Sequence, residues 1–116
     1  MSEMANLPEV LALLWAKFDE WKLFDPDKFG NDALVVEYED AYYDFKRLTD
    51  NRVMGQYLLE IHGDFEVEKE LTLSLDELRA LILAQTRLPT EIFLQIDNEY
   101  KYWYRRKAGE TVFRSA

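Results

Sequence analysis

Apolar and polar residues alternate along residues 91–106, and this period of two constrains the fold more than any other feature. Such alternation is typical of β-strands, which β-branched and aromatic residues favour. A helix capped by Thr90 is the alternative, because an acidic residue begins the segment and basic residues end it. We predict a hairpin with a three-residue loop at residues 97–99. The facing apolar pairs are then Ile96 with Tyr100, Leu94 with Tyr102 and Ile92 with Tyr104.

Residues 53–73 also admit either a helix, which would end at Gly63, or a hairpin. A three-residue loop at residues 62–64 makes one side of the hairpin apolar, whereas a two-residue loop at residues 63–64 sets apolar residues opposite glutamates. We therefore predict the hairpin with the longer loop. Its facing pairs are Ile61 with Phe65 and Leu59 with Val67, and Glu66, Glu68 and Glu70 point outward together.

Two segments combine helical spacing of apolar residues with a capping residue. Residues 74–86 begin with a capping box of Ser74 and Glu77, and residues 7–23 follow Asn6, a preferred N-cap. We predict a helix over each range. The predicted buried stripes are Leu7, Leu11, Leu14, Phe18 and Trp21 in the first, and Leu78, Leu81 and Ile82 in the second.

A third helix is predicted over residues 33–48. Its apolar side chains again recur at intervals of four and three, and Asp32 precedes them as an N-cap. The loop at residues 25–32 begins like a calcium loop, but Phe29 and Val36 stand where oxygen ligands are required, so we expect no metal. The predicted stripe is Leu34, Tyr38, Ala41, Phe45 and Leu48.

These elements follow the order α-α-β-β-α-β-β, with a short edge strand at residues 111–113. We expect a single α+β domain of residues 1–116, with helices packed on an antiparallel sheet. An all-α bundle is the alternative if both hairpins are helices. The 116 residues suffice for one core, and the lack of cysteine excludes a disulfide framework.

The net charge of −9 is distributed unevenly. Residues 1–77 carry 19 acidic and 7 basic side chains, whereas residues 78–116 carry 4 acidic and 7 basic ones. An acidic surface repels phosphate backbones and attracts basic proteins, so we expect a basic protein partner and no direct binding of nucleic acid. The chain has no apolar run near 20 residues and no positively charged N-terminal region. We therefore expect a cytoplasmic protein without membrane contact.

Sequence motifs for catalysis are missing. His62 is the single histidine and falls at a predicted turn, and the chain contains no phosphate-binding glycine motif and no zinc motif. We expect no enzymatic activity and no cofactor. A small enzyme or ligand-binding domain that uses carboxylates and tyrosines is an alternative hypothesis.

Three groups of residues are candidates for partner binding. The first is an acidic ridge on the predicted helix 33–48, edged by tyrosines, which protein interfaces favour. The second is the outward glutamate row of the hairpin 53–73, and the third is an aromatic pair on the hairpin 91–106. The predicted partner-binding residues are Glu37, Asp40, Tyr42, Tyr43, Asp44, Glu66, Glu68, Phe93 and Trp103.

These features favour a non-catalytic, acidic protein-binding module. Our leading hypothesis is an inhibitor of a basic enzyme, in the manner of a bacterial immunity protein or antitoxin that blocks a toxin nuclease. A DNA mimic of the anti-restriction or phage type is the alternative, although the basic C-terminal third argues against it. Pairing of that basic third with the acidic body of a second copy would give a homodimer.

Overall fold

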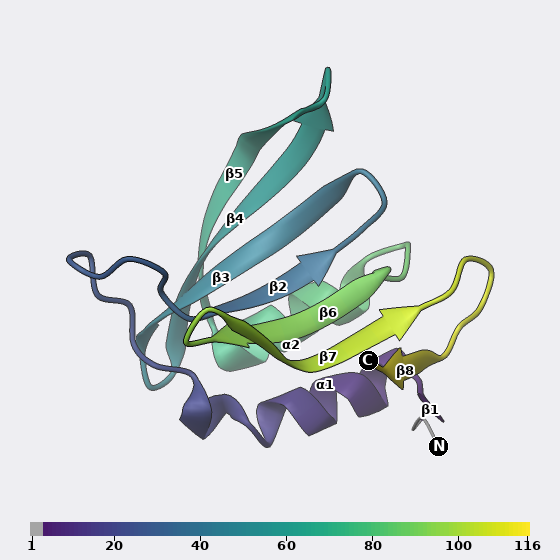
Figure 1. The fold of residues 1–116 in the computed structure, drawn as a ribbon, viewed down its shortest axis with the longest axis horizontal. Coiled ribbons are helices and arrows are strands. Elements are labelled where there is room, and N and C mark those ends of the chain that lie inside the picture. The colour runs from purple at the N-terminus through teal and green to yellow at the C-terminus, as the bar shows by residue number, and fades with distance from the viewer. Residues whose placement is uncertain (1–3) are drawn as a thin grey trace.

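One antiparallel sheet organises the fold. The computed structural model describes residues 4–116, and its eight strands are hydrogen-bonded in the order β1-β8-β7-β6-β2-β3-β4-β5 (Figure 1). Residues 1–3 lie outside the described residues. The N-terminal segment in which we predict no signal begins with these three residues, so part of that prediction falls on them. The strands are β1 (Met4–Ala5), β2 (Ala33–Glu37), β3 (Ala41–Thr49), β4 (Arg52–Ile61), β5 (Asp64–Ser74), β6 (Glu91–Ile96), β7 (Glu99–Arg106) and β8 (Phe113–Ser115). The helices are α1 (Leu7–Trp15), the short 3-10 helix η1 (Phe18–Glu20) and α2 (Leu75–Ala84).

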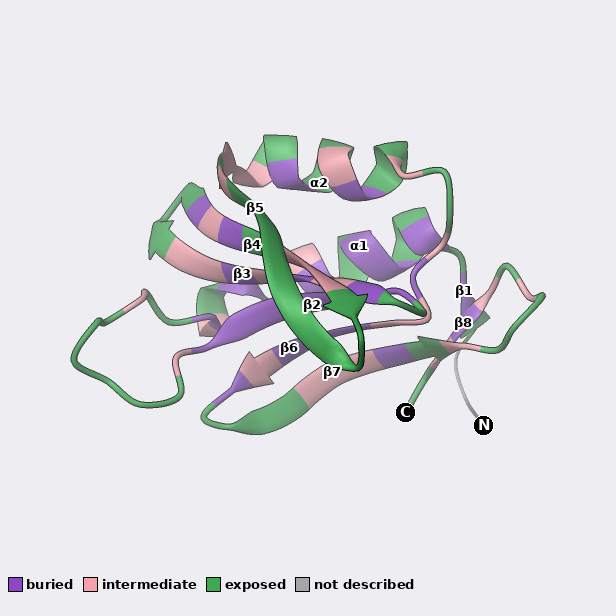
Figure 2. Ribbon diagram, turned by 90° about the horizontal axis from the view of Figure 1, so that it is seen from above, coloured by how far each residue is buried: buried purple, intermediate pink, exposed green. Residues whose placement is uncertain are grey.

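Both α-helices pack on the same face of the sheet. Figure 2 shows α1 and α2 on one side of the strands and neither of them on the other side. Apolar side chains from both helices and from alternate strand residues form the main core, whose fully buried members include Leu14, Trp21, Phe45, Ile82 and Ile92. The opposite face has no helical cover. A smaller buried cluster lies there, consisting of Ala33, Val35 and Phe93.

The predicted order α-α-β-β-α-β-β is wrong, and so is the all-α alternative. Most of the described elements are strands, and the segment 33–48, predicted as the second helix, forms β2 and β3, which pair antiparallel. The helical spacing was misleading because the same residues also alternate within each strand. Leu34 and Val36 of β2, like Phe45 of β3, point into the main core. β2 also pairs with β6 and β3 also pairs with β4, and a pattern within residues 33–48 cannot show a partner as remote as β6.

The first helix is shorter than predicted. Asn6 caps it as predicted and also forms a capping box with Glu9, but α1 ends at Trp15 and the chain continues through η1. The guanidinium group of Arg47 on β3 donates hydrogen bonds to the carbonyl oxygens of Phe18 and Trp21. These bonds tie the segment after α1 to β3, and a tertiary contact of this kind cannot be read from the local spacing of apolar residues.

Asp32 connects two loops instead of capping a helix. Its side chain is buried, with 3% exposed, and its carboxylate accepts hydrogen bonds from the backbone N–H groups of Lys22 at 3.0 Å and Asp97 at 3.1 Å. The indole Nε1 of Trp21 donates to the Asp32 carbonyl oxygen at 3.3 Å. The prediction that Asp32 caps a helix is therefore wrong, because its carboxylate accepts from backbone N–H groups of two remote loops.

Both predicted hairpins are confirmed, and each has a two-residue turn instead of a three-residue loop. The turns are His62–Gly63 between β4 and β5, and Asp97–Asn98 between β6 and β7. All four residues have φ between 52° and 86°, which suits the turn type that matches the twist of paired strands. The predicted register is therefore displaced by one residue near both turns. The observed pairs are Ile61 with Asp64, Leu59 with Glu66, Ile96 with Glu99 and Leu94 with Lys101.

A bulge in each hairpin changes the register again farther from the turn. In β6 and β7 the register shifts between Ile92 and Leu94, and Tyr102 has a φ of 52°. The predicted pairing of Ile92 with Tyr104 is confirmed because this shift cancels the displacement at the turn. The register of β4 and β5 shifts between Tyr57 and Leu58. Our pairing scheme assumed a regular ladder, and bulges break that assumption.

The helix predicted over residues 74–86 is confirmed as α2, and its capping box is present. The Glu77 N–H donates to Ser74 Oγ at 3.1 Å, and the Ser74 N–H donates to Glu77 Oε1 at 2.9 Å. The edge strand predicted at residues 111–113 is displaced to β8, and β1 pairs with its outer side, so β8 is not at the edge. No helix within residues 4–116 is both long and apolar enough to cross a membrane.

Candidate binding surface

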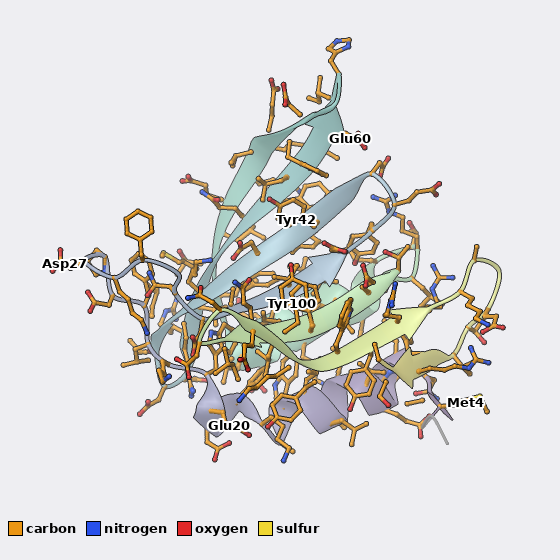
Figure 3. The ribbon with its side chains drawn as sticks, in the orientation of Figure 1. Met4, Glu20, Asp27, Tyr42, Glu60 and Tyr100 are labelled. Atoms are coloured by element: carbon orange, nitrogen blue, oxygen red, sulfur yellow. The ribbon has the colours of Figure 1, made fainter. Side chains whose placement is uncertain are left out.

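The sheet face opposite the helices carries a group of aromatic side chains. Phe93 of β6 stacks on Tyr100 of β7 with ring centroids 4.2 Å apart, and it meets Trp103 edge-on at 6.2 Å. Tyr42 of β3 meets Phe65 of β5 edge-on at 5.0 Å. Tyr42 and Trp103 both pack against the buried cluster at the centre of this face, which joins the two groups. We call these five residues the aromatic face, and Figure 3 shows Tyr42 and Tyr100 on it.

Exposure differs sharply within the aromatic face. Phe93 is buried and forms its floor, whereas Tyr100 is 54% exposed and Phe65 is 49% exposed. The tip of the β4–β5 hairpin lies on the side of the sheet away from the helices, above this face (Figure 2). Monomeric proteins seldom expose a contiguous apolar surface unless it binds something. The aromatic face is therefore the strongest candidate for a binding surface.

Two carboxyl groups lie directly across from each other on the same face. Glu37 of β2 is the cross-strand partner of Glu91 of β6. The indole Nε1 of Trp103 donates to Glu91 Oε1 at 2.8 Å, and Arg105 Nε lies 3.3 Å from the same oxygen. Burial, a hydrogen bond to Glu91 and the negative charge of Glu91 together raise the pKa of Glu37 to about 7. The negative charge of Glu91 is thus balanced by Arg105 and by the hydrogen bond from Trp103. The carboxyl group of Glu37, in contrast, keeps its proton until the pH is near neutral.

The acidic ridge predicted on a helix does not exist in the structure. Asp40 lies in the loop after β2 and forms an ion pair with Arg87 at 2.7 Å. Asp44 pairs with Lys46 of the same strand at 2.8 Å, and Glu37 faces another carboxyl group. Two of the three acids are therefore neutralised by the chain's own basic groups, which removes the geometric basis of the ridge.

Strand geometry separates residues that we predicted would act together. Neighbouring residues of a strand point to opposite faces, so Tyr43 is buried in the main core while Tyr42 belongs to the aromatic face. In β5, Glu68 is the extra residue of the bulge. Because of that extra residue, Glu66 and Glu70 lie on opposite faces, and the predicted outward glutamate row is wrong.

The predicted contact between Phe93 and Trp103 is confirmed. Sequence reasoning missed Tyr100, Phe65 and Glu91 as neighbours on the aromatic face. The missed signal was the turn length, because a two-residue turn moves Tyr100 and Phe65 from the helix side to the open side. Asp and Asn tolerate positive φ, so the Asp97–Asn98 pair could have indicated such a turn.

A shallow depression of about 390 Å³ continues the open face toward the sheet edge. It lies over β3, β4 and β5, and its lining includes carboxylates, a lysine and neutral polar groups. The side chains that line it on the open face are those of Asp44, Lys46, Met54, Gln56, Glu70 and Thr72. The open face therefore passes from an aromatic centre to a polar margin of mixed charge.

No cluster of three or more His, Asp or Glu side chains suited to a metal ion occurs within residues 4–116. Protein-family models, curated proteins and solved structures were each compared with the chain, and none matches it. A functional interpretation must therefore rest on the aromatic face, the carboxyl pair and the charge of the chain.

Proposed function

We propose that this protein is a non-catalytic binding module whose aromatic face docks on a basic partner protein. The observation that carries the proposal is the aromatic surface that neither helix covers, with Tyr100 and Phe65 about half exposed. Tyrosine and tryptophan are enriched at protein interfaces because they supply large contact areas and lose little conformational entropy on binding. The buried Phe93 stacks on Tyr100, and Tyr42 packs against Phe65, so each exposed ring has a neighbour that restricts it.

The charge of the chain favours a basic partner. The net charge is −9, and among residues 4–116 no ion pair includes Glu37. A partner lysine or arginine beside Glu37 would favour its charged carboxylate over the protonated form that hydrogen-bonds to Glu91, and would gain a charge-assisted hydrogen bond. The cleft of a nuclease is cationic because it binds phosphate, so a toxin nuclease has suitable chemistry. The protein would then act as an immunity-type inhibitor in the cytoplasm.

Two variants separate the aromatic face from the rest of the surface. The first combines Phe65→Ser with Tyr100→Ser, and the second is the matched control Leu83→Ser, an exposed side chain on α2. Proteins captured by the wild-type chain are purified and titrated against all three forms by calorimetry at low and high salt. The proposal expects a basic partner that binds the control normally and the double variant at least about 100-fold more weakly.

Proton release gives an independent measurement on the same complex. A partner cation beside Glu37 lowers the pKa of its carboxyl group from about 7, so binding near neutral pH releases a proton. Calorimetry in buffers of different ionisation enthalpy measures that release, and Glu37→Gln should abolish it. Partner affinity that is unchanged in the Phe65 and Tyr100 double variant would rule out the aromatic face as the docking surface.

A further inference from the structure

Strand β5 forms one long edge of the sheet, and no strand of residues 4–116 pairs with its outer side. It is the last strand in the sheet order and pairs with β4 along its whole length, from Asp64 to Ser74. The strand at the other edge of the sheet is β1, which has two residues. Every residue from 64 to 70 is exposed, and Figure 2 shows β5 at the surface. Backbone N–H and C=O groups on the outer side of such an edge can pair with an added strand.

The charge of this edge selects against a second copy of the chain. Residues 64–70 contain four carboxylates and one lysine. Side chains directly opposite each other on paired antiparallel strands lie about 4.5–5.5 Å apart, and like charges at that distance are destabilising. Two β5 edges would bring together two strongly acidic segments. The edge is thus unsuited to self-pairing, although its backbone remains available.

The same charge favours a basic strand. Glu66 and Glu70 project from opposite faces of β5, and Glu68 lies at the bulge between them. An added strand that carries lysine or arginine would therefore find carboxylates on both of its faces. Val67, which is 47% exposed, offers apolar contact between them.

We propose that the β5 edge accepts an extended, basic segment of a partner protein as a ninth strand of the sheet. Backbone hydrogen bonds along β5 would provide the pairing, and the carboxylates would select lysine and arginine side chains. This inference goes beyond the proposed function and does not rest on it, because it uses the edge of the sheet and not the aromatic face.

Three peptides test the proposal against the full chain. The first is a seven-residue peptide of alternating lysine and valine, the second has glutamate in place of lysine, and the third has the lysine sequence with proline at its centre. Proline keeps the charge but cannot complete the strand pairing. We expect the first peptide to bind, the second not to bind, and the third to bind at least about tenfold more weakly. Every second backbone amide of β5 should then exchange its hydrogen at least about tenfold more slowly.

Two charge-reversal variants complete the test. Glu66→Lys with Glu68→Lys should lose the lysine peptide and gain the glutamate peptide. The matched control, Asp19→Lys with Asp27→Lys, has the same net charge but leaves β5 unchanged and should bind as the wild type does. Equal binding of the lysine and proline peptides, or peptide binding without protection of alternate β5 amides, would overturn the proposal.

Discussion

The two faces of the sheet come from alternate residues of the same strands, yet they differ in composition and burial. Leu34, Phe45 and Ile92 on the helix face are fully buried. The opposite face has a buried floor beneath half-exposed aromatic rings and carries the carboxyl pair of Glu37 and Glu91. Because successive residues of a strand point to opposite faces, the buried core side chains lie on one face of the sheet and the exposed aromatic and carboxyl groups lie on the other. Substitutions on the two faces should accordingly affect different measurements.

The largest contrast is expected between Phe45→Ala and Tyr100→Ala. Phe45 is fully buried, so its truncation leaves a cavity and should lower the free energy of unfolding by about 3–5 kcal/mol. Tyr100 is 54% exposed, and its truncation should lower that free energy by less than about 1 kcal/mol. Urea unfolding followed by tryptophan fluorescence measures both. Equal losses would show that the aromatic face is part of the folding core.

A smaller effect is expected at Gly55, which lies against the Phe45 ring on the helix face. A Cβ atom at Gly55 would lie 2.4 Å from Cδ1 of the Phe45 ring, which is closer than real contacts allow. Gly55→Ala should therefore lower the free energy of unfolding by about 1–3 kcal/mol through overpacking. In the background of Phe45→Leu the same substitution should lower it less, because the ring is gone. Identical losses in both backgrounds would contradict the steric explanation.

On the open face, Glu37→Gln should stabilise the fold in a pH-dependent way. The pKa of Glu37 is raised from 4.5 to about 7, so the folded state binds more protons than the unfolded state between these values. Stability from this group is therefore lost as the pH rises from 4.5 to 7. Solvent screens part of the effect, and we expect a gain of about 1–2 kcal/mol for the variant at pH 8 and none at pH 4. Urea unfolding at both pH values measures it; equal gains would exclude proton binding as the cause.

The smallest effect should come from Asp40→Asn. Its partner Arg87 holds the pKa of Asp40 below the usual value of an aspartate, and both side chains are largely exposed. Stability from this pair is present above the unfolded pKa and is lost as the pH falls through the folded pKa. Thermal unfolding at pH 7 should show a slight decrease that disappears at pH 3. A large decrease in the affinity for the partner would instead show that Asp40 belongs to the binding surface.

Several elements that depend on near neighbours could be predicted. The N-cap at Asn6 and the capping box at Ser74 are such elements, as are the two predicted hairpins, β4–β5 and β6–β7. The hairpins β2–β3 and β3–β4, which also join adjacent strands, were missed because the apolar spacing of residues 33–48 fits a helix as well. The contact between Phe93 and Trp103 followed from the same hairpin. Turn length was wrong in both hairpins because alternation alone does not distinguish two loop residues from three. That single residue decided which side chains formed the aromatic face.

By itself the sequence determined where the β4–β5 and β6–β7 hairpins turn, where α1 and α2 begin, and that the first two thirds of the chain are acidic. These properties depend on local spacing, local capping and composition. Only the tertiary structure decided that residues 33–48 form two strands, because β6, far along the chain, pairs with β2 on the side away from β3. It also decided that Asp40 meets Arg87 while Glu37 meets Glu91, since sheet register and loop packing bring these groups together.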